Sequence, residues 1–151
     1  MRAIRFRGKL INSGKWSEGN LIIRKGNNAE ILVFTSPDAT PIGTYGRIDI
    51  NTIGQYTGLH DKNGKEIYEG DIVRVKFRKG FWKYKDKMYY GYKNGSVEYC
   101  VDCFIVYING YKETIYPLSS FGDTGKPIEW LEVIGNIYEN PELLERSSNG
   151  D

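Results

Sequence analysis

Four groups of residues in this sequence are of types that could do chemistry. They are an acidic cluster, a C-x-x-C motif, the one histidine of the chain, and a long run of cations interleaved with aromatic rings. The acidic cluster could bind a divalent cation, and the C-x-x-C motif could bind zinc or exchange disulfides. The histidine could act as a general base, and the run of cations and aromatic rings could contact an anionic partner. The spacing within each group decides which of these interpretations to keep.

The acidic cluster comprises Asp61, Glu66, Glu69 and Asp71. It lacks the spacing of a calcium loop, in which alternating carboxylates precede a bidentate glutamate. Asp61 and Asp71 adjoin glycine-containing turns, where a short carboxylate accepts hydrogen bonds from nearby backbone N–H groups. We therefore expect these residues to brace turns, and we predict no bound metal.

The C-x-x-C motif is formed by Cys100 and Cys103. Zinc would need a second pair of ligands, and the chain contains no other cysteine and only a distant histidine. A redox motif of this kind needs a helix N-terminus to activate one thiol, and no helix is predicted here. Residues three apart on a continuous strand face opposite sides, so we expect the thiols to diverge and to be structural.

His60 would have to serve any catalytic triad or Cys-His pair, because it is the one histidine in the chain. It lies among polar residues beside a predicted turn, which favours a solvated loop residue. No convergent set of acid, base and metal ligands can be named. The sequence therefore predicts that the protein is not an enzyme, has no cofactor and binds no small-molecule ligand.

The most distinctive segment covers residues 74–93. It contains eight basic residues against Asp86 alone, a local charge of +8 − 1 = +7, so the rest of the chain carries +2 − 7 = −5. Residues 129–151 contain six acids and one arginine, a net charge of −5. The candidate binding residues in the basic segment are Arg74, Lys76, Arg78, Lys79, Phe81, Trp82, Lys83, Tyr84, Lys85, Lys87 and Tyr90.

Three interpretations of this segment remain open. Cations displace counterions from a nucleic-acid strand while aromatic rings stack on its bases. Alternatively, the segment contacts a protein, either a host protein or the acidic C-terminal stretch of a second copy in a homo-oligomer. In the third interpretation it is an extended hairpin with core aromatics and solvated lysines, because charge runs alone specify no partner.

The elements that must position these residues are mainly strands. Aromatic residues make up 14% of the chain and 18 glycines punctuate it, which is typical of short strands and tight turns. Ile4 and Phe6 alternate with Arg5 and Arg7, which predicts a strand with one solvated face. Two apolar runs within 20–34 flank a four-residue turn and predict a hairpin.

The second half of the chain shows the same kind of pattern. Asn-Gly pairs within 61–65 and at 109–110 predict turns, and alternation over 72–78 places Val73 and Val75 opposite Arg74 and Lys76. We expect one long strand over 96–108 and a closing strand over 130–138. Asn140-Pro141 predicts the start of one short helix.

At 151 residues, the chain has about the size of one domain with a small appended subdomain. We predict an N-terminal β-rich subdomain over 1–52, a small closed β-barrel over 53–145, and a flexible tail over 146–151. No stretch is long and apolar enough to predict a membrane span. The charged N-terminus and the two cysteines favour the cytoplasm over secretion.

Several stretches resemble the signature of the YopX family. They are IGQYTGL at 53–59, DKNGKEIYEGDIV at 61–73, VIGNIYENPELL at 133–144, and the opening MRAIRFRG. The resemblance implies a small bacteriophage or prophage protein whose second segment is an SH3-like β-barrel, and it implies no activity. Position 60 is His where the family pattern leads us to expect Lys.

Together these features predict a mainly β protein of the bacterial host cytoplasm: an N-terminal β-rich portion, then a C-terminal SH3-like barrel with a short C-terminal helix. The expected function is that of a non-enzymatic phage or prophage accessory protein that acts by protein binding or self-assembly. The alternative is a nucleic-acid-binding module that uses residues 74–93.

Overall fold

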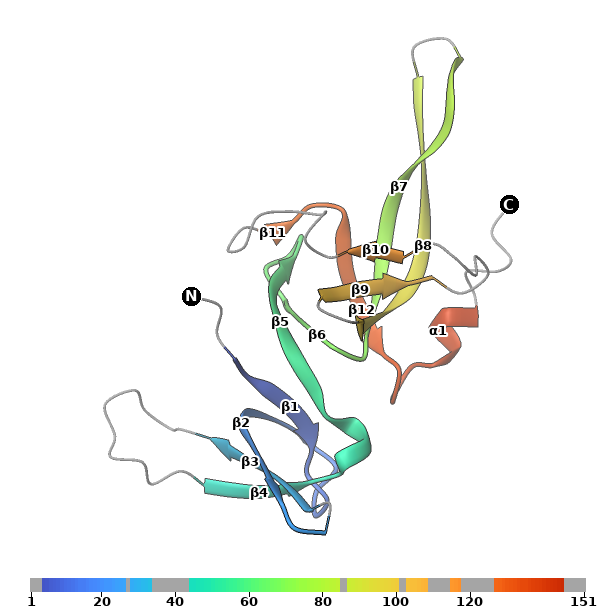
Figure 1. The fold of residues 1–151 in the computed structure, drawn as a ribbon. Coiled ribbons are helices and arrows are strands. Elements are labelled where there is room, and N and C mark those ends of the chain that lie inside the picture. Colours follow the sequence, from blue (N-terminus) through green and yellow to red (C-terminus); the bar gives the residue numbers. More distant parts are fainter. Residues whose placement is uncertain are drawn as a thin grey trace. The chain divides into compact units, whose positions relative to one another are not determined.

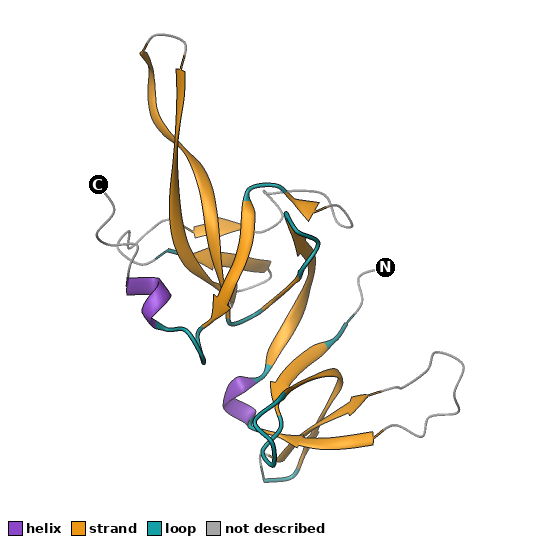
Figure 2. Ribbon diagram, turned by 180° about the vertical axis from the view of Figure 1, so that it is seen from behind, coloured by secondary structure: helices purple, strands orange, loops and turns teal. Residues whose placement is uncertain are grey.

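The computed structural model describes residues 4–26, 28–33, 44–84, 87–100, 103–108, 115–117 and 127–145. At 33, 44–45, 77–84, 87–91, 100, 115–117 and 127–128 it describes the backbone alone. Strands dominate this part of the chain, as predicted (Figure 2). Contacts divide the protein into an N-terminal unit, Met1–Gly58, and a C-terminal unit, Leu59–Asp151. The finer boundary between residues 52 and 53 stays a prediction, and the predicted tail over 146–151 lies outside the described residues.

The N-terminal unit is an antiparallel sheet with the strand order β5-β1-β2-β3-β4 (Figure 1). Its elements are β1 (Phe6–Lys9), β2 (Trp16–Arg24), β3 (Asn28–Val33), β4 (Thr44–Ile48), the 3-10 turn η1 (Ile50–Thr52) and the start of β5 (Gly54–Asp61). The pairing of Arg24 with Asn28 closes the hairpin predicted within 20–34. Ala29, Ile31 and Ile48 form the buried core of this unit, and Phe6 packs against them.

The C-terminal unit is built on a five-stranded antiparallel sheet with the order β10-β9-β8-β7-β12. Its elements are β6 (Glu66–Tyr68), β7 (Asp71–Tyr84), β8 (Lys87–Cys100), β9 (Cys103–Tyr107), β10 (Ile115–Pro117), β11 (Pro127–Ile128), β12 (Leu131–Asn136) and α1 (Glu142–Glu145). The end of β5 pairs with β6 and, in parallel, with β11. Among the described strands this sheet does not close on itself, so the SH3-like barrel stays a prediction.

Alternation along β7 assigns its two faces as predicted. Val73 and Val75 are buried in a core that also contains Val97, Val106 and Leu131, whereas Arg74 is exposed and Lys76 half-buried. The predicted closing strand is β12, which pairs antiparallel with β7, and the predicted short helix is α1.

Two carboxylates of the acidic cluster brace turns, which confirms their predicted structural role. The Asp61 side chain has no exposed surface, and its Oδ1 accepts hydrogen bonds from the backbone N–H groups of Asn63 (2.8 Å) and Lys65 (2.9 Å). Its Oδ2 accepts a third bond, 2.9 Å long, from the N–H of Val133 in β12. Asp71, also buried, accepts from the N–H of Tyr68 at 2.8 Å.

Two sequence-based expectations are wrong. The strand predicted over 96–108 is two antiparallel strands, because β8 ends at Cys100 and β9 begins at Cys103, directly opposite it in the register. The two cysteines are therefore cross-strand partners and do not diverge along one strand. His60 is half-buried within β5, opposite Pro127 of β11, because β5 continues through it to Asp61.

Candidate functional site

Strands β7 and β8 form the long twisted hairpin drawn in green and yellow in Figure 1, and this hairpin carries the predicted basic segment. The backbone register sets Arg78 opposite Tyr90 and Lys79 opposite Tyr89. Of the candidate binding residues, Arg74 and Lys76 lie at its base, and Arg78, Lys79, Phe81, Trp82, Lys83, Tyr84, Lys87 and Tyr90 lie farther along its two strands. Lys85 lies outside the described residues.

One row of side chains crosses the base of this hairpin from Trp130, the residue before β12, to Tyr92 in β8. Lys76 is the central residue: it faces Tyr92 in the register, and its backbone N–H donates to the carbonyl of Trp130 at 2.9 Å. Its Nζ lies 5.2 Å from the centroid of the Trp130 ring, a cation–π contact. Tyr92 is 61% exposed and Trp130 is 40% exposed, so both rings present part of their surface to solvent.

A group of charged residues lies next to that row. Glu132 of β12 is opposite Arg74 in the register, and its Oε2 accepts a hydrogen bond from Nζ of Lys62 at 2.9 Å. Nη1 of Arg74 is 3.8 Å from the same oxygen. Lys62 belongs to the turn braced by Asp61, and its backbone N–H donates to Leu131 at 3.0 Å. The buried Asp61 thus fixes one wall of the site.

These six residues, Lys62, Arg74, Lys76, Tyr92, Trp130 and Glu132, are called the hairpin-base site below. Together with Glu129 and Leu131 they line a shallow hollow of about 170 Å³. That volume is below the range of roughly 300–1,000 Å³ usual for small-molecule pockets. The site is suited to receiving one side chain or one base from a larger partner.

The Lys62–Glu132 ion pair and the Lys76–Trp130 cation–π contact contribute little to stability. Lys62 and Glu132 are partly exposed, and such ion pairs contribute about 0–1 kcal/mol. An exposed cation–π contact contributes about 0.5–1 kcal/mol. Because the core lies on the opposite face of β7, the side chains at this face can be replaced without opening a cavity.

Lys93 is a further titratable residue of the hairpin, and among the described side chains it does not line this hollow. Lys93 is opposite Val75 in the register and is half-buried, and desolvation lowers the pKa of its ammonium below the ordinary value. Within the described ranges, no group of three or more His, Cys, Asp or Glu side chains is placed to hold a metal ion.

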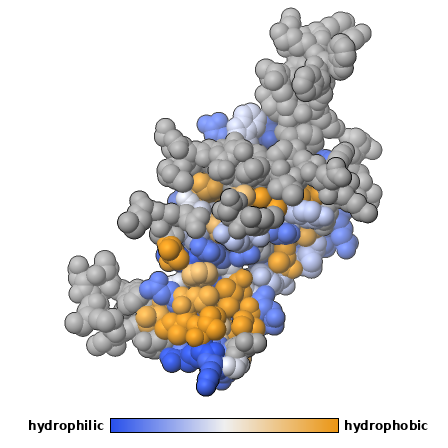
Figure 3. Space-filling model, in the orientation of Figure 1, coloured by the Kyte–Doolittle hydropathy of each residue, from blue (hydrophilic) through white to orange (hydrophobic). Residues whose placement is uncertain are grey.

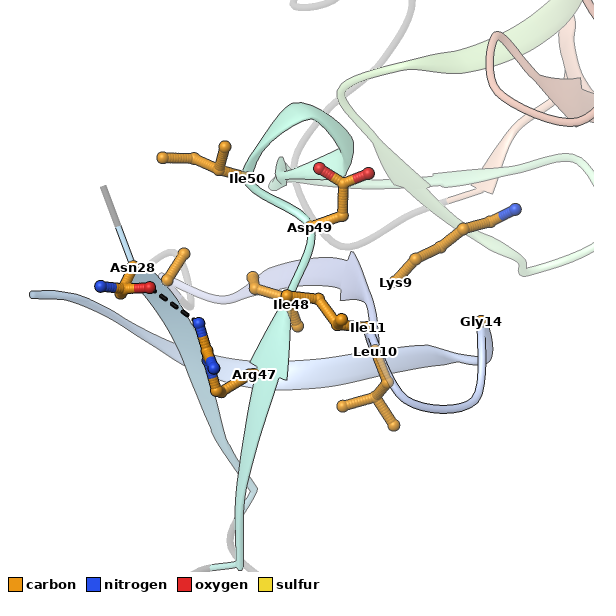
Figure 4. A pocket seen from close by; sticks show the side chains of 10 residues that line it. Lys9, Leu10, Ile11, Gly14, Asn28, Arg47, Ile48, Asp49 and Ile50 are labelled. Atoms are coloured by element: carbon orange, nitrogen blue, oxygen red, sulfur yellow. Dashed lines mark hydrogen bonds between the residues drawn. The ribbon is translucent and has the colours of Figure 1, made fainter. Parts of the chain in front are cut away.

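A second hollow, of about 510 Å³, lies in the N-terminal unit (Figure 4). Its walls include Leu10, Ile11 and Ile48, and Figure 3 shows apolar side chains gathered on one face of this unit. Arg47 turns toward Asn28, to whose Oδ1 it donates at 2.8 Å, while Lys9 points away from it. These polar groups do not converge on one point, so the hollow defines no ligand.

Arg74 and Lys76 of this site were predicted from the sequence. Tyr92 lies within the basic segment but was not among the predicted binding residues, and Lys62, Trp130 and Glu132 are distant from that segment in the chain. A signal for Trp130 was present, since it opens the predicted closing strand. Pairing that strand antiparallel against residues 72–78 would have brought Trp130 beside Lys76. The sequence alone gave no reason to choose this pairing over others.

Comparison with known proteins identifies the family. In the part of the chain that the structure describes, no helix is long and apolar enough to span a membrane. No curated protein matches the sequence. The crystal structure of protein EF1440 from Enterococcus faecalis is similar at 25% identity and a TM-score of 0.55, over 95% of this chain and 99% of that one. The family described as YopX protein matches residues 5–145, nearly the whole chain, and the protein therefore belongs to the YopX family.

Proposed function

We propose that this protein is a non-enzymatic phage or prophage accessory protein that acts by binding another protein in the cytoplasm of the bacterial host. We further propose that its C-terminal unit is an SH3-like barrel and that the partner is a second copy of the chain. The observation that carries the binding proposal is the pair of exposed rings, Trp130 and Tyr92, on either side of Lys76 within the hairpin-base site.

The composition of the hairpin-base site favours a protein partner. Tyr, Trp and Arg are the residues that most often dominate the binding energy of protein interfaces. Its hollow is lined by three cations and by Glu129 and Glu132, a net charge of +3 − 2 = +1. The two carboxylates would repel a phosphate backbone, whereas a protein surface can present charges of both signs.

The distribution of charge favours a second copy as that partner. The basic segment carries a net charge of +7 and residues 129–151 carry −5, so the sequence contains two segments of opposite charge. Glu142 and Glu145 are exposed on α1. Complementary charges of this kind steer association and suppress wrong partners.

A charge-swap experiment tests the self-association proposal. One variant carries Lys76→Glu, Lys79→Glu and Lys83→Glu, and a second carries Glu142→Lys and Glu145→Lys. Each variant alone should fail to assemble, because like charges then meet at the interface. A mixture of the two should assemble, because the charge-reversed hairpin of one variant then meets the charge-reversed α1 of the other. Light scattering measures the masses, and a mixture that remains monomeric would refute the proposed interface.

Single-stranded nucleic acid is the second candidate partner. It is favoured by the two exposed rings on either side of Lys76, since successive bases stack on such rings at about 1–3 kcal/mol each. This candidate predicts an affinity that falls with salt, with a log–log slope of about −0.7 per phosphate contacted. The same lysine-to-glutamate variant should then lose binding to a mixed oligonucleotide pool. An affinity that is insensitive to salt would exclude this candidate.

A further inference from the structure

Arg74, at the base of the β7–β8 hairpin, lies near a carboxylate that is already bound to another cation. Its Nη1 is 3.8 Å from Oε2 of Glu132, which is longer than a hydrogen bond, and that oxygen accepts from Nζ of Lys62 at 2.9 Å. The side chain of Arg74 is 46% exposed. A guanidinium presents a planar fork of N–H donors that matches the two oxygens of a carboxylate. Arg74 can therefore receive a carboxylate from outside the chain.

The hollow around Arg74 favours one glutamate side chain as its occupant. The side chains that line this hollow carry a net charge of +3 − 2 = +1, so one carboxylate would neutralise it. Its volume of about 170 Å³ is suited to one side chain. The exposed Tyr92 ring on its wall can pack against the two methylene groups of a glutamate. Charge, size and apolar surface thus agree on the same kind of residue.

The short helix α1 packs on the same face of the sheet as Arg74. Asn94 of β8 is directly opposite Arg74 in the register, and opposed residues project from the same face. Nδ2 of Asn94 donates to the backbone carbonyl of Leu143 at 2.8 Å, which holds α1 against this face. Glu142 and Glu145 are exposed and, three residues apart, are neighbours on the helix surface. One face of the sheet therefore carries a cation site next to an acidic helix.

We propose that two copies of the chain meet across this face about a two-fold axis, so that a glutamate of α1 from each copy binds Arg74 of the other. This inference rests on the proposed self-association and adds the residue pair and the symmetry. A two-fold interface uses the same patch on both copies, so the patch must carry both members of the contact. The adjacent cation site and acidic helix meet this requirement. Among the described side chains, neither carboxylate of α1 forms an ion pair with Arg74 of its own chain, which leaves this contact to a second copy.

A double-mutant cycle on the full-length chain tests this pair. Arg74→Gln removes the cation, and a second variant carries Glu142→Gln together with Glu145→Gln. The dissociation constant of each assembly is measured by light scattering over a dilution series. Because a two-fold interface contains the contact twice, either variant should raise this constant about a hundredfold, at about tenfold per contact. All three changes combined in one chain should add little beyond either variant, since each removes the same contact.

Two further variants serve as controls. Arg24→Gln also removes an exposed arginine, but one that pairs with Glu30 in the N-terminal unit, so it should leave the dissociation constant unchanged. Arg74→Lys keeps the charge and loses the planar fork, so its dissociation constant should lie between those of the wild type and Arg74→Gln. Urea unfolding of every variant checks that the chain still folds.

The outcomes separate this inference from the proposed function. A wild-type chain that stays monomeric would refute self-association and this inference together. A wild-type assembly that Arg74→Gln leaves equally tight would overturn this inference alone, as would additive effects in the cycle. An assembly with an odd number of copies, or one whose mass keeps growing with protein concentration, would also overturn it, because head-to-tail contacts produce those forms.

Discussion

Removal of the Asp61 carboxylate should strongly destabilise the C-terminal unit. This side chain joins the turn after β5 to β12 through three backbone hydrogen bonds of 2.8–2.9 Å. Asp61→Ala leaves the buried N–H of Val133 without its acceptor, whereas water can replace the bonds to Asn63 and Lys65, which are exposed. Asp61→Asn keeps the shape of the side chain but removes one of its two acceptor oxygens.

The expected loss follows from these three bonds. An unsatisfied buried donor costs about 1–3 kcal/mol, and each bond that water replaces costs about 0.5–1.5 kcal/mol. Asp61→Ala should therefore lower the free energy of unfolding by about 2–6 kcal/mol, and Asp61→Asn by about 2 kcal/mol. Against a total of roughly 5–15 kcal/mol for a typical domain, either loss is easy to measure.

Urea unfolding followed by circular dichroism and tryptophan fluorescence measures these losses. Glu142→Gln is the matched control, since it also removes a carboxylate from the C-terminal unit but at an exposed position, and it should change stability by less than about 0.5 kcal/mol. An Asp61→Ala protein within about 1 kcal/mol of the wild type would refute the assigned role.

Three further substitutions have clear expected outcomes. Gly70→Ala should lower the urea midpoint more than Gly64→Ala: both glycines have φ near +80°, but an added Cβ meets the Tyr138 ring at 3.0 Å only at Gly70. Equal effects would contradict that close contact. Ile72→Ala should cost about 2–5 kcal/mol in thermal unfolding, because the side chain is fully buried, and a loss under 1 kcal/mol would contradict its place in the core. Lys76→Ala should change the unfolding free energy by less than about 1 kcal/mol, since its cation–π contact is with an exposed ring; a larger loss would show that the hairpin-base site is structural.

Local patterns in the sequence were sufficient for much of the fold. Alternation alone separated Val73 and Val75 from Arg74 and Lys76, because period two is a property of each strand by itself. The turn after Asp61 was likewise predictable, since Asn63-Gly64 and a short carboxylate are local signals.

Features that depend on pairing between strands were not predictable. The residues between β8 and β9, Val101-Asp102, contain no glycine and no Asn-Gly pair, so continuous alternation concealed the separation into two strands. His60 was misjudged because its strand extends to pair with β11, a partner more than sixty residues later in the chain. Of the hairpin-base site, only Arg74 and Lys76 were predicted, since Trp130 meets Lys76 only through the register of β12 on β7.

The most direct test of the central claim is the mass of the wild-type protein in solution. Size-exclusion chromatography with light scattering is run at low and high salt, with and without a mixed oligonucleotide pool. We expect an assembly with a mass near a whole multiple of 17.3 kDa that dissociates at high salt. Addition of the oligonucleotides should not change this mass. A chain that remains at 17.3 kDa at every salt and protein concentration would contradict self-association, and a shift caused by oligonucleotides at low salt would assign the basic hairpin to nucleic acid.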